Sequence, residues 1–195
     1  MASLEAPKVP VYSVNDLKAA TDDALVPYLT SLPPPYTFTQ DHSKTNVRFA
    51  IGYSAVAIAA FTFYADRQLG WEATQSPWII AAVTSYFVLN SLLTYWIWAV
   101  EGGEVFRGNR KTGETLTIRS SVTAHSPLYK LDVKYTSPSN KTLQEKNLET
   151  KFTNWFSADG VFHPKPFRTW LSKEIEVLQL AAKEQEKLSG GLSGQ

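Results

Sequence analysis

Three histidines give this chain its widest range of possible chemistry, because an imidazole can bind a metal ion or exchange a proton near neutral pH. They are His42, His125 and His163. All three fall in predicted loops far apart in the sequence, and no two have the spacing that places metal ligands together on a helix or strand. The chain has no cysteine, which excludes thiolate metal sites, disulfides and cysteine nucleophiles. The sequence therefore predicts no metal site.

Motifs for nucleophilic catalysis and for phosphate binding are missing from the sequence. No serine lies in the nucleophile-elbow pattern, and the glycine-rich phosphate-binding patterns are absent. Thr74 and Ser76 have no lysine beside them to act as a base, and Arg67 stays protonated and cannot serve. We therefore predict that the chain has no catalytic residue, binds no cofactor and is not an enzyme.

The elements that would position any site are dominated by two long apolar runs. These are Phe49–Ala65 and Trp78–Val100, only 12 residues apart. In hydrocarbon every backbone polar group must be satisfied within its own segment, so each run is expected to be a helix. At roughly 1.5 Å per residue the second run reaches about 35 Å and the first about 25 Å. The pattern predicts a transmembrane hairpin with helices at 47–65 and 78–100. A buried soluble hairpin is the alternative, although 23 uncharged residues are long for a core helix.

Aromatic residues mark both ends of this predicted hairpin. Indole rings favour the headgroup region, where the ring is buried and its N–H stays wet. Four of the six tryptophans lie where the two interfaces should be. We predict that they are interfacial anchors, with Trp71 and Trp78 at one end and Trp96 and Trp98 at the other. The connecting segment 66–77 is too short to hold a domain.

The orientation follows from the basic residues near the spans. Those outside the hairpin are Lys44, Arg48, Arg107, Arg110, Lys111 and Arg119. The connecting loop holds only Arg67, so the positive-inside rule places both termini in the cytosol and the loop in the lumen. No apolar region of a signal peptide precedes the first span, which is expected to act as the targeting signal itself. In this orientation the sequon Asn140–Lys141–Thr142 stays unglycosylated.

Small and polar residues within the spans are candidates for helix packing. Neither run contains a charged residue, which disfavours a pump or transporter. Asn90 lies near the middle of the second run, and an amide in hydrocarbon seeks a partner on another helix. In the first run the candidates for close approach are Gly52, Ser54, Ala55 and Ala59. Either the two spans simply pack on each other, or part of this surface meets helices of another protein.

The sequence outside the hairpin predicts an N-terminal segment and a small domain. Residues 1–46 contain one helix, which Ser13 or Asn15 can cap, followed by the stiff connector Pro33–Pro35. Residues 101–188 begin with a loop up to 113 and form an α+β domain. Residues 189–195 are expected to be a disordered tail.

Within the domain, alternating apolar residues predict strands near 116–122, 129–135 and 148–152. A single amphipathic helix starts near Pro164 and presents an apolar stripe, made of Phe167, Leu171, Ile175, Leu178 and Ala182. The predicted fold class is therefore a membrane protein with a two-helix transmembrane hairpin and a small cytosolic α+β domain, whose antiparallel sheet has about three strands. With 19 basic and 18 acidic residues the chain suggests no nucleic-acid partner.

Longer blocks of the sequence resemble signal peptidase complex subunit 2, in its fungal form. The blocks are Val14–Pro33, Gly52–Glu72, Tyr129–Tyr135 and Phe152–Gly160. The resemblance covers nearly the whole chain up to its glycine- and serine-rich end. It implies a non-catalytic accessory subunit of the enzyme that removes signal peptides in the endoplasmic reticulum membrane. It also implies three kinds of partner: the other subunits including the catalytic one, the β subunit of the protein-conducting channel, and the lipid bilayer.

Two other interpretations of the hairpin are consistent with the residues alone. One is an integral-membrane enzyme of lipid metabolism, which needs clustered His, Asp or Glu at the membrane boundary, where this chain has only Glu101 and Glu104. The other is a curvature-forming hairpin protein of the endoplasmic reticulum. Such hairpins wedge into one leaflet, whereas the two aromatic belts favour full spans.

Overall fold

The computed structural model describes residues 8–74, 76–124 and 126–191, and it leaves out the side chains of Leu69, of residues 71–74 and of residues 186–191. The described chain forms two compact units. The first joins the residues up to Asp41 with those from Gly103 onward, and the second is His42–Gly102. The N-terminal residues thus belong to the unit of the C-terminal domain, although the sequence pattern sets residues 1–46 apart from it.

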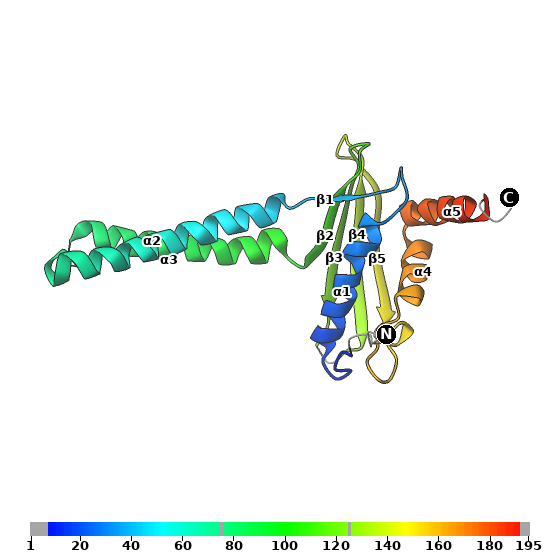
Figure 1. The fold of residues 1–195 in the computed structure, drawn as a ribbon, viewed down its shortest axis with the longest axis horizontal. Helices are drawn as coiled ribbons and strands as arrows, with labels where there is room; N and C mark the ends of the chain where they lie inside the picture. Colours follow the sequence, from blue (N-terminus) through cyan, green and yellow to red (C-terminus); the bar gives the residue numbers. More distant parts are fainter. Residues whose placement is uncertain (1–7, 75, 125, 192–195) are drawn as a thin grey trace, which may run out of the picture. The chain divides into compact units, whose positions relative to one another are not determined.

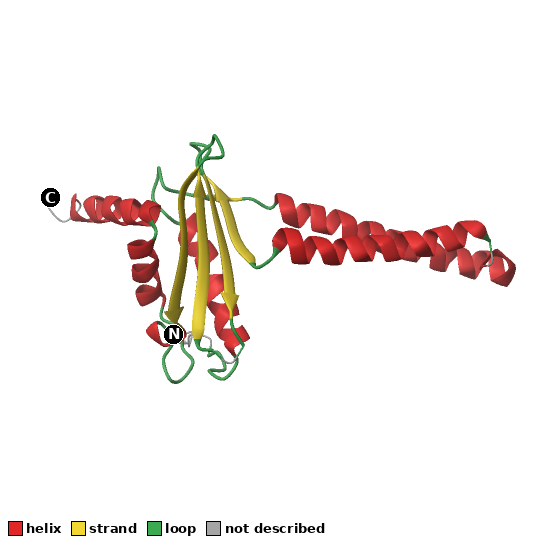
Figure 2. Cartoon of the chain, turned by 180° about the vertical axis from the view of Figure 1, so that it is seen from behind, coloured by secondary structure: helices red, strands yellow, loops and turns green. Residues whose placement is uncertain are grey.

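The first unit is built on one antiparallel sheet with the strand order β1-β2-β3-β4-β5 (Figures 1 and 2). The strands are β1 (Thr39–Gln40), β2 (Glu104–Asn109), β3 (Thr115–Val122), β4 (Leu128–Thr136) and β5 (Thr142–Lys151). Leu116 lies opposite Tyr135 and Ile118 opposite Val133 across the central pair. Side chains of β3 and β4 alternate between a buried and a more exposed face, as their period of two predicts.

The sheet has five strands, so the prediction of about three is wrong. β2 falls inside the predicted loop 101–113, because only Phe106 and Gly108 of its six residues are buried and the apolar signal is weak. A Cβ added to Gly108 would lie 2.6 Å from the Phe106 ring, so this strand position needs glycine. β5 begins six residues before the predicted start at 148, because an edge strand can be polar on both faces.

Three helices of the first unit pack around the buried face of the sheet. α1 (Val14–Thr30) is capped by Ser13, whose Oγ accepts a hydrogen bond from the Asp16 amide at 3.3 Å. Pro27 lies inside α1, and the helix ends one turn later. α4 (Pro164–Glu174) and α5 (Glu176–Gly191) follow a short 3-10 turn, η2 (Phe152–Asn154). Their buried residues share one core with α1 and the sheet, including Leu25, Leu131, Trp155, Phe167 and Leu171.

The single C-terminal helix of the sequence prediction is divided at Ile175. This residue is extended, with φ −111° and ψ 116°, and its side chain is buried. Gln144 of β5 satisfies the backbone groups that the break releases: its Nε2 donates to Glu174 O at 3.4 Å, and its Oε1 accepts from the Glu176 amide at 3.3 Å. α5 continues to Gly191, three residues into the predicted tail 189–195, and residues 192–195 lie outside the described chain.

The second unit is a helical hairpin. Its first helix, α2 (Ser43–Thr74), is interrupted at Gly70, which has a φ of 72° that favours glycine. The second helix, α3 (Pro77–Tyr95), continues as a π-helix, η1 (Trp96–Glu101). Ser43–Gln68 and Pro77–Glu101 are long and apolar enough to cross a membrane, judged by length and composition. The predicted spans 47–65 and 78–100 lie within these two helices.

Candidate functional site

The two helices of the hairpin pack on each other along one stripe of each. In α2 the more buried positions recur at intervals of three and four residues, at Ile51, Ala55, Ile58, Thr62 and Ala65. In α3 and η1 they recur at intervals of three, four or seven residues, at Ile79, Ala82, Leu89, Leu93 and Trp96. This spacing is that of helices packing at a shallow crossing angle. The two helices of the hairpin therefore pack on each other.

Most of the hairpin surface is apolar and uncovered. Large side chains that are more than half exposed include Tyr53, Val56, Phe61, Phe63, Ile80 and Phe87. A contiguous apolar surface of this kind on a water-soluble monomer is a liability, whereas in a membrane it faces hydrocarbon. The surface of the hairpin therefore needs lipid or other membrane helices around it.

The five predicted packing residues have different environments. Ala55 is buried between the helices. Gly52, Ala59 and Asn90 line hollows beside the packing stripe. Ser54 is exposed, and its Oγ donates back to Ala50 O at 2.7 Å. The structure thus brings Gly52 and Asn90 to one hollow and separates Ser54 from them.

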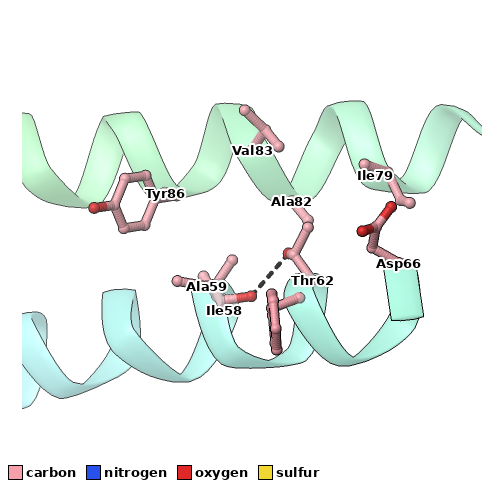
Figure 3. Close-up of a pocket in the computed structure, with 9 residues that line it drawn as sticks. Ile58, Ala59, Thr62, Asp66, Ile79, Ala82, Val83 and Tyr86 are labelled. Carbon is pink, nitrogen blue, oxygen red and sulfur yellow. Dashed lines mark hydrogen bonds between the residues drawn. The ribbon is translucent and has the colours of Figure 1, made fainter. Parts of the chain in front are cut away.

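Those hollows lie on one flank of the hairpin and together form what we call the lateral groove. One is lined by Ile58, Ala59, Thr62, Phe63, Asp66, Ile79, Ala82, Val83 and Tyr86 (Figure 3). The other shares Tyr86 and is lined also by Arg48, Phe49, Gly52, Tyr53, Ala55, Val56, Asn90, Leu93 and Ile97. Flanking residues recur every seven positions, as Gly52, Ala59 and Asp66 and as Val83, Asn90 and Ile97, so both hollows open on the same side of each helix.

The predicted tryptophan anchors lie at the helix ends. Trp78 is in the first turn of α3, with its ring 5.9 Å from that of Phe61. Trp98 is 79% exposed. Trp96 is turned toward α2, and its indole nitrogen is buried without a hydrogen-bond partner among the described residues. The side chain of Trp71 lies outside the described part of the chain.

Charged residues join the two helices at the end that holds η1. Arg48 of α2 donates to Glu101 Oε2 at 2.8 Å, and Lys44 Nζ donates to Val100 O at 3.1 Å. The ammonium group of Lys44 therefore satisfies a carbonyl at the C-terminal end of the helix, where a cation is favourable. Sequence reasoning counted Lys44 and Arg48 for orientation only and missed this link, because nothing in the sequence pairs them with residues more than 50 positions away.

The two histidines in the described part of the chain do not form a site. His42 and His163 are exposed, and His125 lies outside the described residues. Within residues 8–74, 76–124 and 126–191, no three His, Cys, Asp or Glu side chains are placed to hold a metal ion. His163 instead precedes the first turn of α4, and its amide donates to Trp155 O at 2.7 Å.

Among the described side chains of the first unit, the most buried carboxylate is that of Asp22 in α1. It accepts hydrogen bonds from Tyr129 Oη at 2.7 Å, from Ser120 Oγ at 2.8 Å and from Lys18 Nζ at 2.6 Å. Burial, together with the neighbouring negative charge of Asp22, raises the pKa of the Tyr129 hydroxyl. With three donors on one carboxylate, Asp22 joins α1 to β3 and β4.

A second polar cluster surrounds Arg110, between β2 and β3. Its guanidinium donates to Pro35 O at 3.1 Å and to Tyr135 Oη at 2.9 Å, and it also pairs with Glu114. Burial opposes ionisation of Glu114, but hydrogen bonds from Tyr135 and Thr112 and the charge of Arg110 hold its pKa below the usual value. Burial and the bond to Glu114 raise the pKa of Tyr135 to about 12. The cluster fixes the proline connector to the sheet.

The fold and its surfaces define a class of protein: an α+β unit whose sequence is interrupted, between β1 and β2, by a two-helix membrane hairpin. Over residues 16–176 the chain matches the family described as the microsomal signal peptidase 25 kDa subunit. It is also similar to signal peptidase complex subunit 2 of Saccharomyces cerevisiae, with 24% identity over 182 residues, which are 92% of this chain and 98% of the yeast protein.

The family match covers most of the chain, including both helices of the hairpin and all strands of the sheet. The chain therefore belongs to the family of the 25 kDa subunit of microsomal signal peptidase. This confirms the resemblance that the sequence blocks indicate.

Proposed function

We propose that the chain acts as a non-catalytic accessory subunit of the signal peptidase complex in the endoplasmic reticulum membrane. The observation that carries the proposal is the match to the signal peptidase subunit family over residues 16–176. The exposed apolar hairpin supports it, since such a surface needs lipid or other membrane helices around it.

The polar clusters of the first unit also support a non-catalytic role. Asp22 and Glu114 each accept hydrogen bonds from three side chains, and each holds structural elements together. The protease chemistry then belongs to another subunit of the complex.

In the proposed arrangement both termini and the α+β unit lie in the cytosol, and residues 66–77 form a short lumenal loop. The excess of basic residues outside the hairpin supports this orientation. The hairpin packs against helices of the other subunits, including the catalytic one. The cytosolic unit is then available to the β subunit of the protein-conducting channel.

Deletion of the gene in cells that keep all other subunits tests the role. Pulse labelling of several secreted precursors is expected to show slower removal of signal peptides that is not abolished, because an accessory subunit supports the active site without forming it. Complete loss of cleavage, with the catalytic subunit still present at normal level, would contradict the non-catalytic role. Unchanged cleavage rates for every precursor would contradict a supporting role.

A further inference from the structure

The length of the lateral groove limits what can occupy it. Arg48 at one end and Asp66 at the other are 18 positions apart on α2 (66 − 48), which is about 27 Å along a helix. The hydrocarbon core of a bilayer is about 30 Å thick, and the acyl chains of one leaflet cover half of it. An occupant that fills the groove therefore crosses both leaflets, as a transmembrane helix does and a single lipid does not.

Asn90 adds a polar requirement inside this apolar groove. Its Nδ2 donates to Tyr86 O at 2.8 Å, and none of the described residues donates a hydrogen bond to its Oδ1. An amide oxygen that faces hydrocarbon is unfavourable until a donor reaches it. An acyl chain has no donor to offer. The occupant is therefore an apolar helix that carries one hydrogen-bond donor, such as Ser, Thr, Asn or Gln, at the depth of Asn90.

The α2 side of the groove is shaped for a close approach by such a helix. Apart from the adjoining backbone of α2, no described atom lies within 4 Å of the position that a Cβ would take at Gly52, and Ala59 carries only a methyl group. Larger residues recur every seven positions along the outer edge, as Phe49, Val56 and Phe63. Small residues beside larger ones allow helix backbones to approach closely, and this packing drives helix association in lipid.

We propose that the lateral groove binds one transmembrane helix of another subunit of the complex, with a donor of that helix bonded to Asn90 Oδ1. The inference rests on the proposed function and adds to it the face of the hairpin that is used. Phe61 and Gln68 line a different hollow, together with Trp78. Phe61 lies two positions, or about 200° around the helix, from Phe63 of the groove.

Site-specific photocrosslinking in the intact complex tests which face of the hairpin contacts another subunit. The full chain, carrying benzoylphenylalanine at position 63 or at position 61, replaces the native copy in cells. Both positions hold phenylalanine, and they are matched in exposure at 64% and 61%. Irradiation at position 63 is expected to link the chain to a different polypeptide, with a yield several times that at position 61.

Three results overturn the groove assignment: adducts with lipid alone, a product with twice the mass of this chain, or equal yields at the two positions. Co-purification of the catalytic subunit is scored in the same samples. If the catalytic subunit is recovered while position 63 gives one of these results, the groove assignment fails and the proposed function stands.

A pair of substitutions tests the hydrogen bond to Asn90. Asn90→Leu is expected to weaken crosslinking from position 63 roughly threefold, which corresponds to the average strength of a side-chain hydrogen bond between membrane helices. The control is Ser85→Leu, since Ser85 is exposed, lies outside the groove and donates to Ala81 O of its own helix at 2.8 Å. Equal effects of the two substitutions would contradict a hydrogen bond from the partner helix to Asn90 Oδ1.

Discussion

Tyr129 of β4 donates a hydrogen bond of 2.7 Å to Asp22 of α1, and this pair joins two elements that lie more than 100 positions apart in the chain. Thr21, the residue next to Asp22, accepts a hydrogen bond from Trp155 Nε1 at 3.2 Å. Consecutive residues of α1 thus bind the central sheet and the aromatic core. The packing of the N-terminal helix onto the domain therefore depends on a short polar sequence within an otherwise apolar interface.

Tyr129→Phe is expected to destabilise the protein by about 1.5–3 kcal/mol, the usual contribution of a hydrogen bond to a charged group. The substitution keeps the buried ring and leaves Asp22 with two of its three donors. Urea unfolding of the detergent-solubilised chain, followed by tryptophan fluorescence, measures the change. Tyr12→Phe is the matched control, since Tyr12 is 90% exposed. A Tyr129→Phe protein as stable as this control would contradict the structural role of the pair.

The Glu114 cluster is expected to stabilise the protein only above acidic pH. Its folded-state pKa lies below the usual value, so its contribution is present above the unfolded pKa, near 4.3, and is lost as the pH falls through the folded value. Compared with Glu114→Gln, the native protein should be more stable at pH 7 by up to about 1 kcal/mol. This difference should shrink below about pH 4. A difference that is the same at pH 7 and pH 3 would contradict the assignment.

The same cluster is expected to lose part of its stabilising effect at alkaline pH, when Tyr135 ionises. Its folded-state pKa is raised to about 12, above the value near 10 expected in the unfolded chain. The stabilising contribution of its protonated hydroxyl is therefore complete below about pH 10 and is lost as the pH rises through about 12. Absorbance titration of tyrosine in the native protein and in Tyr135→Phe measures this group. A group that titrates near pH 10 and disappears in Tyr135→Phe would contradict the prediction.

Gln144→Ala should loosen the junction between α4 and α5. The side chain of Gln144 bonds to Glu174 O and to the Glu176 amide, and its removal leaves both backbone groups to water at a cost of about 1 kcal/mol. Hydrogen exchange of the amides near Ile175 should become faster. Asn147→Ala, on an exposed position of the same strand, is the control and should not change exchange at the junction. Faster exchange near Ile175 in both variants would contradict a specific role of Gln144, because it would show that changes elsewhere on β5 loosen the junction too.

The proposed orientation predicts that Asn140 carries no glycan in cells. Its sequon would lie in the cytosol, where the glycosylation machinery is absent. An insertion of about 20 flexible residues with an added sequon after residue 75 should be glycosylated, because it lengthens a lumenal loop. Mobility before and after endoglycosidase treatment measures both sites. A glycan on Asn140 would reverse the orientation.

Local pattern predicts the parts of this fold in which burial follows a simple period. The alternation from Tyr129 to Tyr135 predicts β4, and the uncharged runs predict the positions of α2 and α3. The sequence does not predict β1 or the first six residues of β5, since edge strands need little apolar surface. It also does not predict the break at Ile175, because the partner that satisfies it lies on a distant strand.

The residues of the candidate site can be predicted from the sequence, but their arrangement cannot. Asn90 and Gly52 stand out in the sequence as a polar and a small residue within apolar runs. Their convergence in one groove, and the separation of Ser54 from it, require the register of α2 against α3. That register is set by contacts between residues on two different helices, and the hydrophobic period within one helix carries no information about it.

Affinity purification of the tagged full chain in mild detergent tests whether the chain is a subunit of the signal peptidase complex. The chains that co-purify are identified by mass spectrometry, with an unrelated two-span membrane protein as the control. The account predicts recovery of the catalytic subunit of signal peptidase together with other subunits of the complex. Recovery of the chain as a lone monomer, from cells in which the catalytic subunit is present and stable in the same detergent, would contradict it.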